Sequence, residues 1–205
     1  MELVILGATG ATGRELVKQA LARGHDVVAL ARDPSRIDAP ASAALRRVRA
    51  DVHDPKSLAA AIGRDSIVLS ALGVSKGDAA GVLTSGARAL GALQPARLLW
   101  LGAFGTGPSA RAAGWLTRRL LSLMGPRLAD KVAADALVLR QGGVVFHAGP
   151  LSDAALSPTR RTVPLAQAPR RLFPAGVSRA SVAAAMLDEA EQPRHSGEVI
   201  LPLER

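Results

Sequence analysis

The first 23 residues constrain the fold of this chain more than any other stretch. An apolar run at 3–6 has the length and character of a buried strand, and it leads directly into Gly7, Gly10 and Gly13. The segment that follows, 15–23, carries apolar residues at helical spacing. A strand, a glycine-rich turn and a helix in this order predict the first unit of a nucleotide-binding βαβ fold.

Glycine suits this turn for two reasons. It tolerates the positive φ that a tight strand-to-helix turn needs, and it lets backbone N–H groups approach a pyrophosphate at the positive end of the helix. The spacing is Gly-x-x-Gly-x-x-Gly, whereas the commonest dinucleotide fingerprint is Gly-x-Gly-x-x-Gly. The alternative is a turn that packs through its small residues and binds no ligand.

The rest of the chain alternates strand and helix patterns. Strands are expected at 26–31, 45–50, 66–71, 97–101 and from 144 onward, helices at 56–62 and 80–93, and a last helix and strand at 178–191 and 198–201. This pattern predicts an α/β fold: a Rossmann-like doubly wound parallel sheet with strand order 3-2-1-4-5-6, helices on both faces, and one domain over residues 1–205. A ligand is expected between the ends of the first and fourth strands. We expect 152–174 to be irregular, and 104–125 and 150–177 to supply walls of a substrate pocket.

Composition narrows the range of partners. The net charge is +9 and the basic residues are scattered arginine pairs, but there is no tyrosine and there are only three Phe and two Trp. The chain therefore has too few aromatic side chains to form a surface on which nucleic-acid bases stack. The charge predicts a basic surface that attracts anionic small molecules, and nucleic acid is not an expected partner. The absence of cysteine excludes disulfides and thiolate metal sites and fits a cytoplasmic protein. No apolar run approaches the roughly 18 residues of a membrane span, and the histidines show no metal-ligand spacing, so neither a membrane nor a metal is expected.

The end of the second expected strand bears on the choice of coenzyme. In the Rossmann arrangement an acid there accepts hydrogen bonds from the ribose of NAD, whereas an arginine suits the 2′-phosphate of NADP. This sequence offers both, Arg32 and Asp33. We favour Arg32, and hence NADP over NAD, because Arg32 directly follows the apolar strand and Asp33-Pro34 has the character of a turn. Arg14 and Arg36 are candidates for further charge near the same phosphate.

Several motifs resemble a known family. The segments GATGATG at 7–13, VVALAR at 27–32 and DV at 51–52 resemble the atypical short-chain dehydrogenase/reductases. The likeness is closest to the compact NAD(P)H-binding branch that includes biliverdin reductase B, a flavin reductase, and the nitrogen-regulator-like sensors. It continues in KVAADALV at 131–138, VVFHAGPLSD at 144–153 and VSRASVA at 177–183, and it covers nearly the whole chain.

The resemblance implies roles for individual residues. The pyrophosphate would lie on the glycine turn, the adenine against the third strand end, and the nicotinamide ribose beside a lysine. The residues at these positions are Gly7, Thr9, Gly10, Ala11, Thr12 and Gly13 for the pyrophosphate, Arg32 for the 2′-phosphate, Asp51 and Val52 for adenine, Ser70, Ala71 and Leu72 at the fourth strand end, and Lys131 for the ribose.

The departures from the family pattern are equally informative. Typical short-chain dehydrogenases carry a catalytic Tyr four residues before that lysine, and here Arg127 stands in its place. Gly102 and Ala103 stand where a Ser usually ends the fifth strand. Alcohol oxidation through a tyrosine is therefore excluded, and what remains is hydride delivery by the coenzyme with a proton from another group.

These observations predict an NAD(P)H-dependent reductase, NADPH preferred, that transfers hydride to a flavin, quinone or carbonyl compound. His147 and Lys131 are the catalytic candidates, since histidine changes charge near neutral pH; for His147 a structural role is the alternative. The expected substrate pocket consists of Gly102, Ala103, Phe104, Trp115 and His147. The competing interpretation is a non-catalytic NAD(P)-binding redox sensor, and the expected assembly is a monomer or homodimer with a small-molecule substrate.

Overall fold

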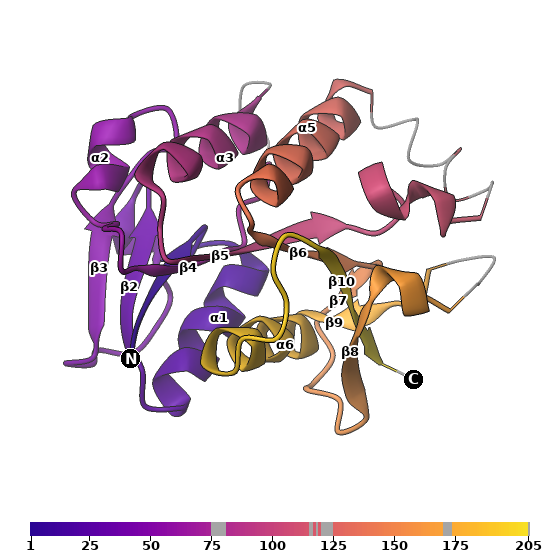
Figure 1. The fold of residues 1–205 in the computed structure, drawn as a ribbon. Coiled ribbons are helices and arrows are strands. Elements are labelled where there is room, and N and C mark those ends of the chain that lie inside the picture. Colours follow the sequence, from indigo (N-terminus) through magenta and orange to yellow (C-terminus); the bar gives the residue numbers. More distant parts are fainter. Residues whose placement is uncertain (75–80, 115–116, 118, 120–124, 170–173, 205) are drawn as a thin grey trace.

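The computed structural model describes every residue except 75–80, 115–116, 118, 120–124, 170–173 and 205, which are grey in Figure 1. Its first half alternates strands and helices along the chain. The elements are β1 (Glu2–Leu6), α1 (Ala11–Ala22), β2 (Asp26–Ala31), the 3-10 turn η1 (Pro34–Arg36), β3 (Leu45–Arg49), α2 (Pro55–Ala59), β4 (Ile67–Ser70), α3 (Val82–Leu93) and β5 (Arg97–Ala103). The expected strands and helices of this half are all present, with ends displaced by at most four residues.

The second half contains one more long helix on each side of the sheet and several short elements. These are η2 (Gly107–Arg111), α5 (Pro126–Arg140), β6 (Val144–Ala148), β7 (Leu151–Ser152), β8 (Arg160–Pro164), η3 (Leu165–Gln167), β9 (Val177–Ser178), α6 (Arg179–Glu191) and β10 (Val199–Glu204). The expectation that 152–174 is wholly irregular is wrong, because β8 and η3 lie inside it.

One eight-stranded sheet organises the molecule, with strand order β3-β2-β1-β4-β5-β6-β10-β8. The pairs from β3 to β10 are all parallel, and this confirms the order 3-2-1-4-5-6 of a Rossmann-like fold. Only β8 is antiparallel, where it pairs with β10 at the edge of the sheet. The sequence pattern did not predict this strand, because RRTVP has little of the apolar alternation that indicates a strand and turn residues surround it.

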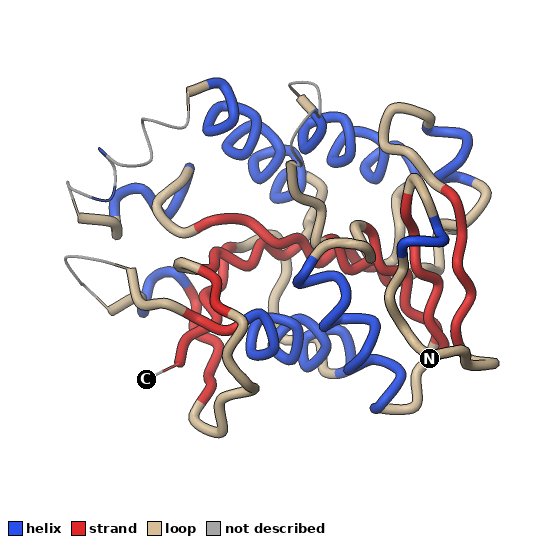
Figure 2. The backbone as a smooth tube through the Cα atoms, turned by 180° about the vertical axis from the view of Figure 1, so that it is seen from behind, coloured by secondary structure: helices blue, strands red, loops and turns tan. Residues whose placement is uncertain are grey.

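Helices cover both faces of the sheet, as Figures 1 and 2 show from opposite sides. β1 shows why: Leu3 and Ile5 belong to the core cluster under α1 and α6, while Val4 and Leu6 belong to the cluster under α2, α3 and α5. Successive side chains of a strand point to opposite faces, so an uninterrupted apolar strand needs cover on both sides. Two cores of about equal extent therefore hold a single sheet between them.

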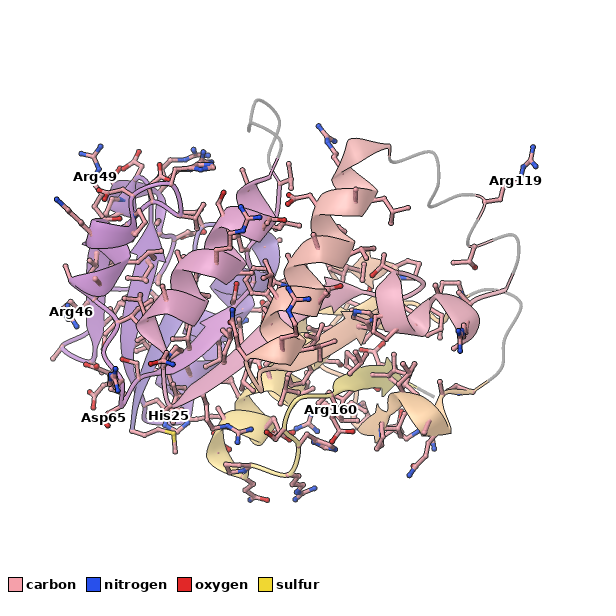
Figure 3. All side chains as sticks on the ribbon, turned by 45° about the horizontal axis from the view of Figure 1, so that its top comes forward. His25, Arg46, Arg49, Asp65, Arg119 and Arg160 are labelled. Carbon is pink, nitrogen blue, oxygen red and sulfur yellow. The ribbon has the colours of Figure 1, made fainter. Side chains whose placement is uncertain are left out.

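The basic side chains are dispersed over the surface. Arg46 and Arg49 project from the edge strand β3, Arg160 lies at the start of β8, and Arg119 lies beyond η2, at separate places around the molecule in Figure 3. Several others are neutralised by carboxylates, as in the pair between Arg97 and Glu189 at 2.8 Å. Within the described residues, no helix is long and apolar enough to span a membrane.

Candidate functional site

A long groove follows the carboxyl ends of the parallel strands. It has a cavity volume of about 650 Å³ and crosses from the β2–β3 edge, past β1 and β4, to β5 and β6. The sheet reverses its winding direction at β1 and β4, and this is the position at which open α/β sheets bind ligands. Most residues expected at a coenzyme site line the groove, namely Gly7, Thr9, Gly10, Ala11, Thr12, Arg32, Asp51, Val52, Ala71, Leu72 and Lys131. Gly102 and Ala103, which were expected in the substrate pocket, line it as well.

Glycine is found at the three positions of this turn for different physical reasons. Gly7 has φ +82°, and a Cβ there would lie 2.8 Å from the carbonyl oxygen of Ala71. Gly13 packs directly on the backbone of Gly7, so a Cβ would overlap it. Gly10 has an ordinary φ of −72°, and an added Cβ would meet only the Gly7 oxygen at 3.3 Å. The protein's own packing therefore explains Gly7 and Gly13, while Gly10 leaves an open approach from the groove to the backbone.

The amino-terminal end of α1 opens into this groove without a side-chain cap. The cap residue is Gly10, which has no side chain to accept a hydrogen bond from the first turn, and that turn holds no acidic residue. The free N–H groups and the helix dipole make such an end attractive to an anion. Other helices are capped: Asp54 accepts from the amide of Lys56 at α2, and Ser178 accepts from the amide of Ser181 at α6.

Arginines gather at the β2 end of the groove. Arg32 and Arg36 line it together with Asp33, while Arg14 lines a neighbouring hollow instead. The Asp33 carboxylate accepts hydrogen bonds from the hydroxyl of Ser35 at 2.6 Å and from its amide at 3.1 Å. These bonds hold the pKa of Asp33 below its usual value, with the side-chain bond the larger cause. Asp33 therefore caps η1 as an ionised carboxylate.

Asp51 and Val52 stand where the third strand ends. The Asp51 carboxylate accepts a hydrogen bond from the amide of His53 at 2.9 Å, and its own amide donates to the hydroxyl of Ser57. These contacts hold the turn that leads into α2 and fix one wall of the groove.

Two of the predicted coenzyme-binding residues, Ser70 and Gly13, lie outside the groove. Ser70 is fully buried, and its hydroxyl accepts from the amide of Leu72 at 3.4 Å. Gly13 is covered by Gly7. Both residues shape the turn and the β4 end on which the groove rests, so a ligand would meet their neighbours.

At the other end of the groove, His147 lies in a buried hydrogen-bonded chain. Its Nδ1 is 2.6 Å from the hydroxyl of Ser109 and its Nε2 is 3.0 Å from the carboxylate of Asp135, and the side chain is only 1% exposed. Thr106 adds a 3.4 Å hydrogen bond to Asp135. Gly102 makes room for the ring, because a Cβ there would lie 2.7 Å from the His147 Cδ2. The glycine that replaces the family serine is thus what accommodates this histidine.

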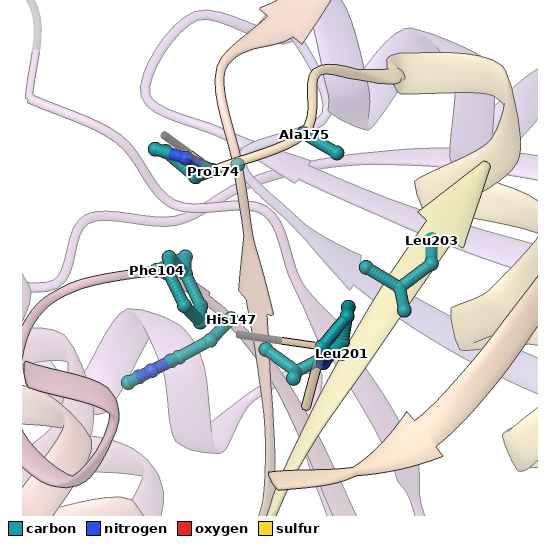
Figure 4. Close-up of a pocket in the computed structure, with 8 residues that line it drawn as sticks. Phe104, His147, Pro174, Ala175, Leu201 and Leu203 are labelled. Carbon is teal, nitrogen blue, oxygen red and sulfur yellow. The ribbon is translucent and has the colours of Figure 1, made fainter. Parts of the chain in front are cut away.

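A small apolar pocket, with a cavity volume of about 30 Å³, adjoins His147 (Figure 4). Phe104 and His147 stand on one side of it, and Leu201 and Leu203 of β10 on another. Gly149 lines both this pocket and the long groove, so the pocket lies next to that end of the groove. The expected pocket residue Trp115 lies outside the described residues.

The pattern of the sequence missed three contributors to this region. Arg179 and Leu151 line the groove, and Asp135 holds His147. Arg179 stands in the segment VSRASVA, but nothing in its spacing indicated that α6 begins at the groove. Asp135 lies one helical turn after Lys131, and that spacing was the available signal. Among the described residues, no group of three potential metal ligands comes together.

Solved structures with this fold match the whole chain. ChuY, an anaerobilin reductase of Escherichia coli O157:H7, is 21% identical with a TM-score of 0.80, over 100% of this chain and 97% of that one. The oxidoreductase YlbE of Lactococcus lactis is 18% identical with a TM-score of 0.79, over 100% and 91%. A proposed NADH-flavin reductase of Streptococcus pneumoniae is 20% identical with a TM-score of 0.76, over 100% of both chains.

These likenesses concern the fold, since identities near 20% do not carry an activity from one protein to another. None of the curated protein sequences compared with this chain matches it. The family model described as NAD(P)H-binding matches residues 7–193, which span the glycine turn, the groove and α6. The chain belongs to this NAD(P)H-binding family.

Proposed function

We propose that the protein is an NADPH-dependent reductase that transfers hydride to a small conjugated acceptor, such as a flavin, quinone or carbonyl compound, without a catalytic tyrosine. The observation that carries the proposal is the groove: it runs from an arginine-rich end, past the uncapped end of α1, to an apolar pocket beside His147. A nicotinamide dinucleotide supplies hydride when it is bound. The rest of this subsection concerns what the chain's own residues do.

NADPH is favoured over NADH by the charges at the β2 end. Arg32 and Arg36 line the groove there, and the Asp33 carboxylate is engaged by Ser35. An arginine forms strong charge-assisted hydrogen bonds with a phosphate, whereas a ribose hydroxyl needs an acceptor. In this proposal Arg32 holds the 2′-phosphate and Lys131, across the groove, holds the nicotinamide ribose.

His147 is the proposed source of the proton. Ser109 has one hydroxyl hydrogen, and its oxygen lies 2.6 Å from the His147 Nδ1 and 3.1 Å from the carbonyl oxygen of Thr106. When His147 is neutral the hydroxyl donates to Nδ1, and when His147 is charged the hydroxyl accepts from Nδ1 and donates to Thr106 instead. Asp135 accepts from Nε2 in both states. Both states therefore leave every buried donor paired. Because both ring nitrogens are engaged inside the protein, the proton would leave through Ser109, whose hydroxyl releases its own hydrogen as its oxygen accepts one from Nδ1.

The acceptor would lie in the adjoining part of the groove, against the small apolar pocket at Phe104 and His147. The described lining of that pocket is mostly aliphatic, aromatic and proline carbon, so it favours a flat apolar ring system that excludes water from the reacting carbon. Gly102 and Ala103 form the adjoining part of the groove. The proposed acceptor thus meets the coenzyme near Gly149, which lines both the pocket and the groove.

Steady-state NADPH oxidation tests the proposal, with FMN, menadione and biliverdin offered as acceptors. We expect turnover with at least one of them. Tight coenzyme binding without turnover on any acceptor would point instead to a redox sensor, a role that the absent tyrosine and the enclosed His147 also suit. A His147→Ala protein with an unchanged rate and pH profile would remove the proposed proton source.

The coenzyme preference has its own test. Arg32→Ala should weaken NADPH binding by about ten- to a hundredfold, as expected for charge-assisted hydrogen bonds of about 1.5–3 kcal/mol, and should leave NADH nearly unchanged. Arg46→Ala is the control, because Arg46 is an exposed arginine on β3 outside the groove. Equal losses for both coenzymes in Arg32→Ala would overturn the assignment to the 2′-phosphate.

A further inference from the structure

Arg179 lines two hollows, and both are also lined by the first residue of α1. Arg179 is the first residue of α6 and lines the long groove. It also lines a second hollow, with a cavity volume of about 370 Å³, that runs along α1. Ala11, the first residue of α1, lines the same two hollows. The Arg179 side chain therefore stands beside the uncapped helix end described above.

Arg179 stands in the first turn of α6, where a cation opposes the helix dipole and the turn itself carries no acidic residue. The carboxylate of Glu204 lies at the same helix end, but it accepts from the amide and hydroxyl of the cap residue Ser178. The hydrogen-bonding partner of Arg179 is Asp153, with Nη1 to Oδ1 at 2.7 Å. The Asp153 side chain is 86% exposed, and exposed pairs of this kind contribute only about 0.2–1 kcal/mol. The ion pair between Arg179 and Asp153 is therefore weak enough for a more strongly bound anion to displace Asp153.

We propose that Arg179 exchanges Asp153 for the diphosphate of the coenzyme and binds it against the amino-terminal end of α1. This inference rests on the proposed function, because it assumes that a dinucleotide occupies the groove. It adds a binding residue from α6, far along the chain from the glycine turn.

The charge balance of the groove supports this role. A dinucleotide diphosphate carries two negative charges, whereas a helix end supplies only about half a positive charge. Among the described residues of the groove, Arg32 and Arg36 lie at its β2 end, and Lys131 belongs to α5 on the opposite face of the sheet from α1. Arg179 is the described groove cation on the α1 side, and a guanidinium binds phosphate oxygens through two parallel hydrogen bonds.

Calorimetry with coenzyme fragments separates Arg179 from Arg32. Arg179→Ala should weaken NADPH, NADH and ADP-ribose alike by about tenfold or more, because all three contain the diphosphate. It should leave adenosine 2′-monophosphate unchanged, since that ligand has the 2′-phosphate but no diphosphate. Arg32→Ala should show the reverse pattern, with a loss for NADPH and adenosine 2′-monophosphate only.

Asp153 provides a test in the opposite direction. Asp153→Asn releases Arg179, so NADPH and NADH should bind about two- to fivefold more tightly, in line with the strength of an exposed ion pair. The gain should vanish when Arg179 is also replaced by Ala, because the two residues act through one contact. A gain that persists in the double variant would contradict the exchange of partners.

Lys18→Ala is the matched control for these measurements. Lys18 lies on α1, lines the second hollow but not the groove, and its loss changes the net charge by the same amount. Its coenzyme affinity should stay within about twofold of the wild type, at a level that exposed charges reach. Urea unfolding of every variant confirms that the fold is intact.

The outcomes distinguish the two proposals. A wild-type protein that binds no dinucleotide would overturn the proposed function and this inference together. A wild-type protein that binds NADPH, with Arg179→Ala binding it equally well, would overturn the role of Arg179 and leave the proposed function standing.

Discussion

The amino-terminal ends of α1 and α3 face similar electrostatic demands and meet them differently. At α3, the carboxylate of Asp130 on α5 accepts from the amides of Leu83 and Thr84 at 3.1 and 2.9 Å, and from the Thr84 hydroxyl at 2.6 Å. At α1, the cap residue Gly10 has no side chain to fill this role, and the first turn carries no acidic residue. The protein therefore neutralises one helix end with its own anion and leaves the other for an anion from outside. The difference separates a structural helix end from a binding one.

Gly13→Ala should have the largest effect on the amino-terminal end of α1. The new Cβ would overlap the Gly7 backbone, so the turn that presents the α1 amides would have to move. We expect coenzyme binding to fall below detection in calorimetry and the free energy of unfolding to drop by about 2–3 kcal/mol in urea titrations, as overpacking does.

Gly10→Ala is the matched substitution at the same turn. Here the stability should change by less than about 1 kcal/mol, since the Gly10 backbone suits any residue, but affinity should fall because the methyl group faces the ligand. Equal effects of the two substitutions on stability and on binding would contradict the separate roles assigned to these glycines.

Asp130→Ala would give α3 an uncapped end like that of α1. Two amides and one hydroxyl would lose their acceptor in a buried place, so the free energy of unfolding should fall by about 2 kcal/mol. Asp130→Asn keeps one oxygen acceptor and should recover part of the loss. Chemical denaturation monitored by the fluorescence of the buried Trp100 would measure both. A loss as large in Asp130→Asn as in Asp130→Ala would show that the charge, and not hydrogen bonding, matters.

Ala11→Asp would do the converse and supply α1 with an anion of its own. Ala11 is exposed at the first position of the helix, where an acidic side chain stabilises by about 0.3–1 kcal/mol. Thermal unfolding without coenzyme should show this small gain, while calorimetry should show weaker NADPH binding, because the new carboxylate repels the diphosphate. Unchanged affinity would mean that the diphosphate does not approach this end of α1.

The glycine turn, the strand order and most of one groove wall were predictable, for a physical reason. They depend on local patterns: apolar runs of strand length, helical spacing, and glycine at fixed offsets after a strand. The residues expected at the groove from 7–12, 51–52 and 71–72 all line it, because a parallel sheet brings its strand ends to one edge. β8 was not predictable in this way, since an antiparallel edge strand rich in arginine lacks an apolar pattern.

The doubly wound sheet and the anion-accepting turn at its centre could be predicted from the sequence, because they depend on backbone propensity and apolar patterns among neighbouring residues. The contacts between residues far apart in the chain became known from the three-dimensional structure alone. It placed Arg179 of α6 beside Ala11, Asp135 of α5 on His147, and Asp130 on the end of α3. Arg179 and Ala11 are 168 positions apart in the sequence, Asp135 and His147 are 12 apart, and Asp130 and Thr84 are 46 apart. These contacts follow from the packing of helices on the two faces of the sheet rather than from any local spacing.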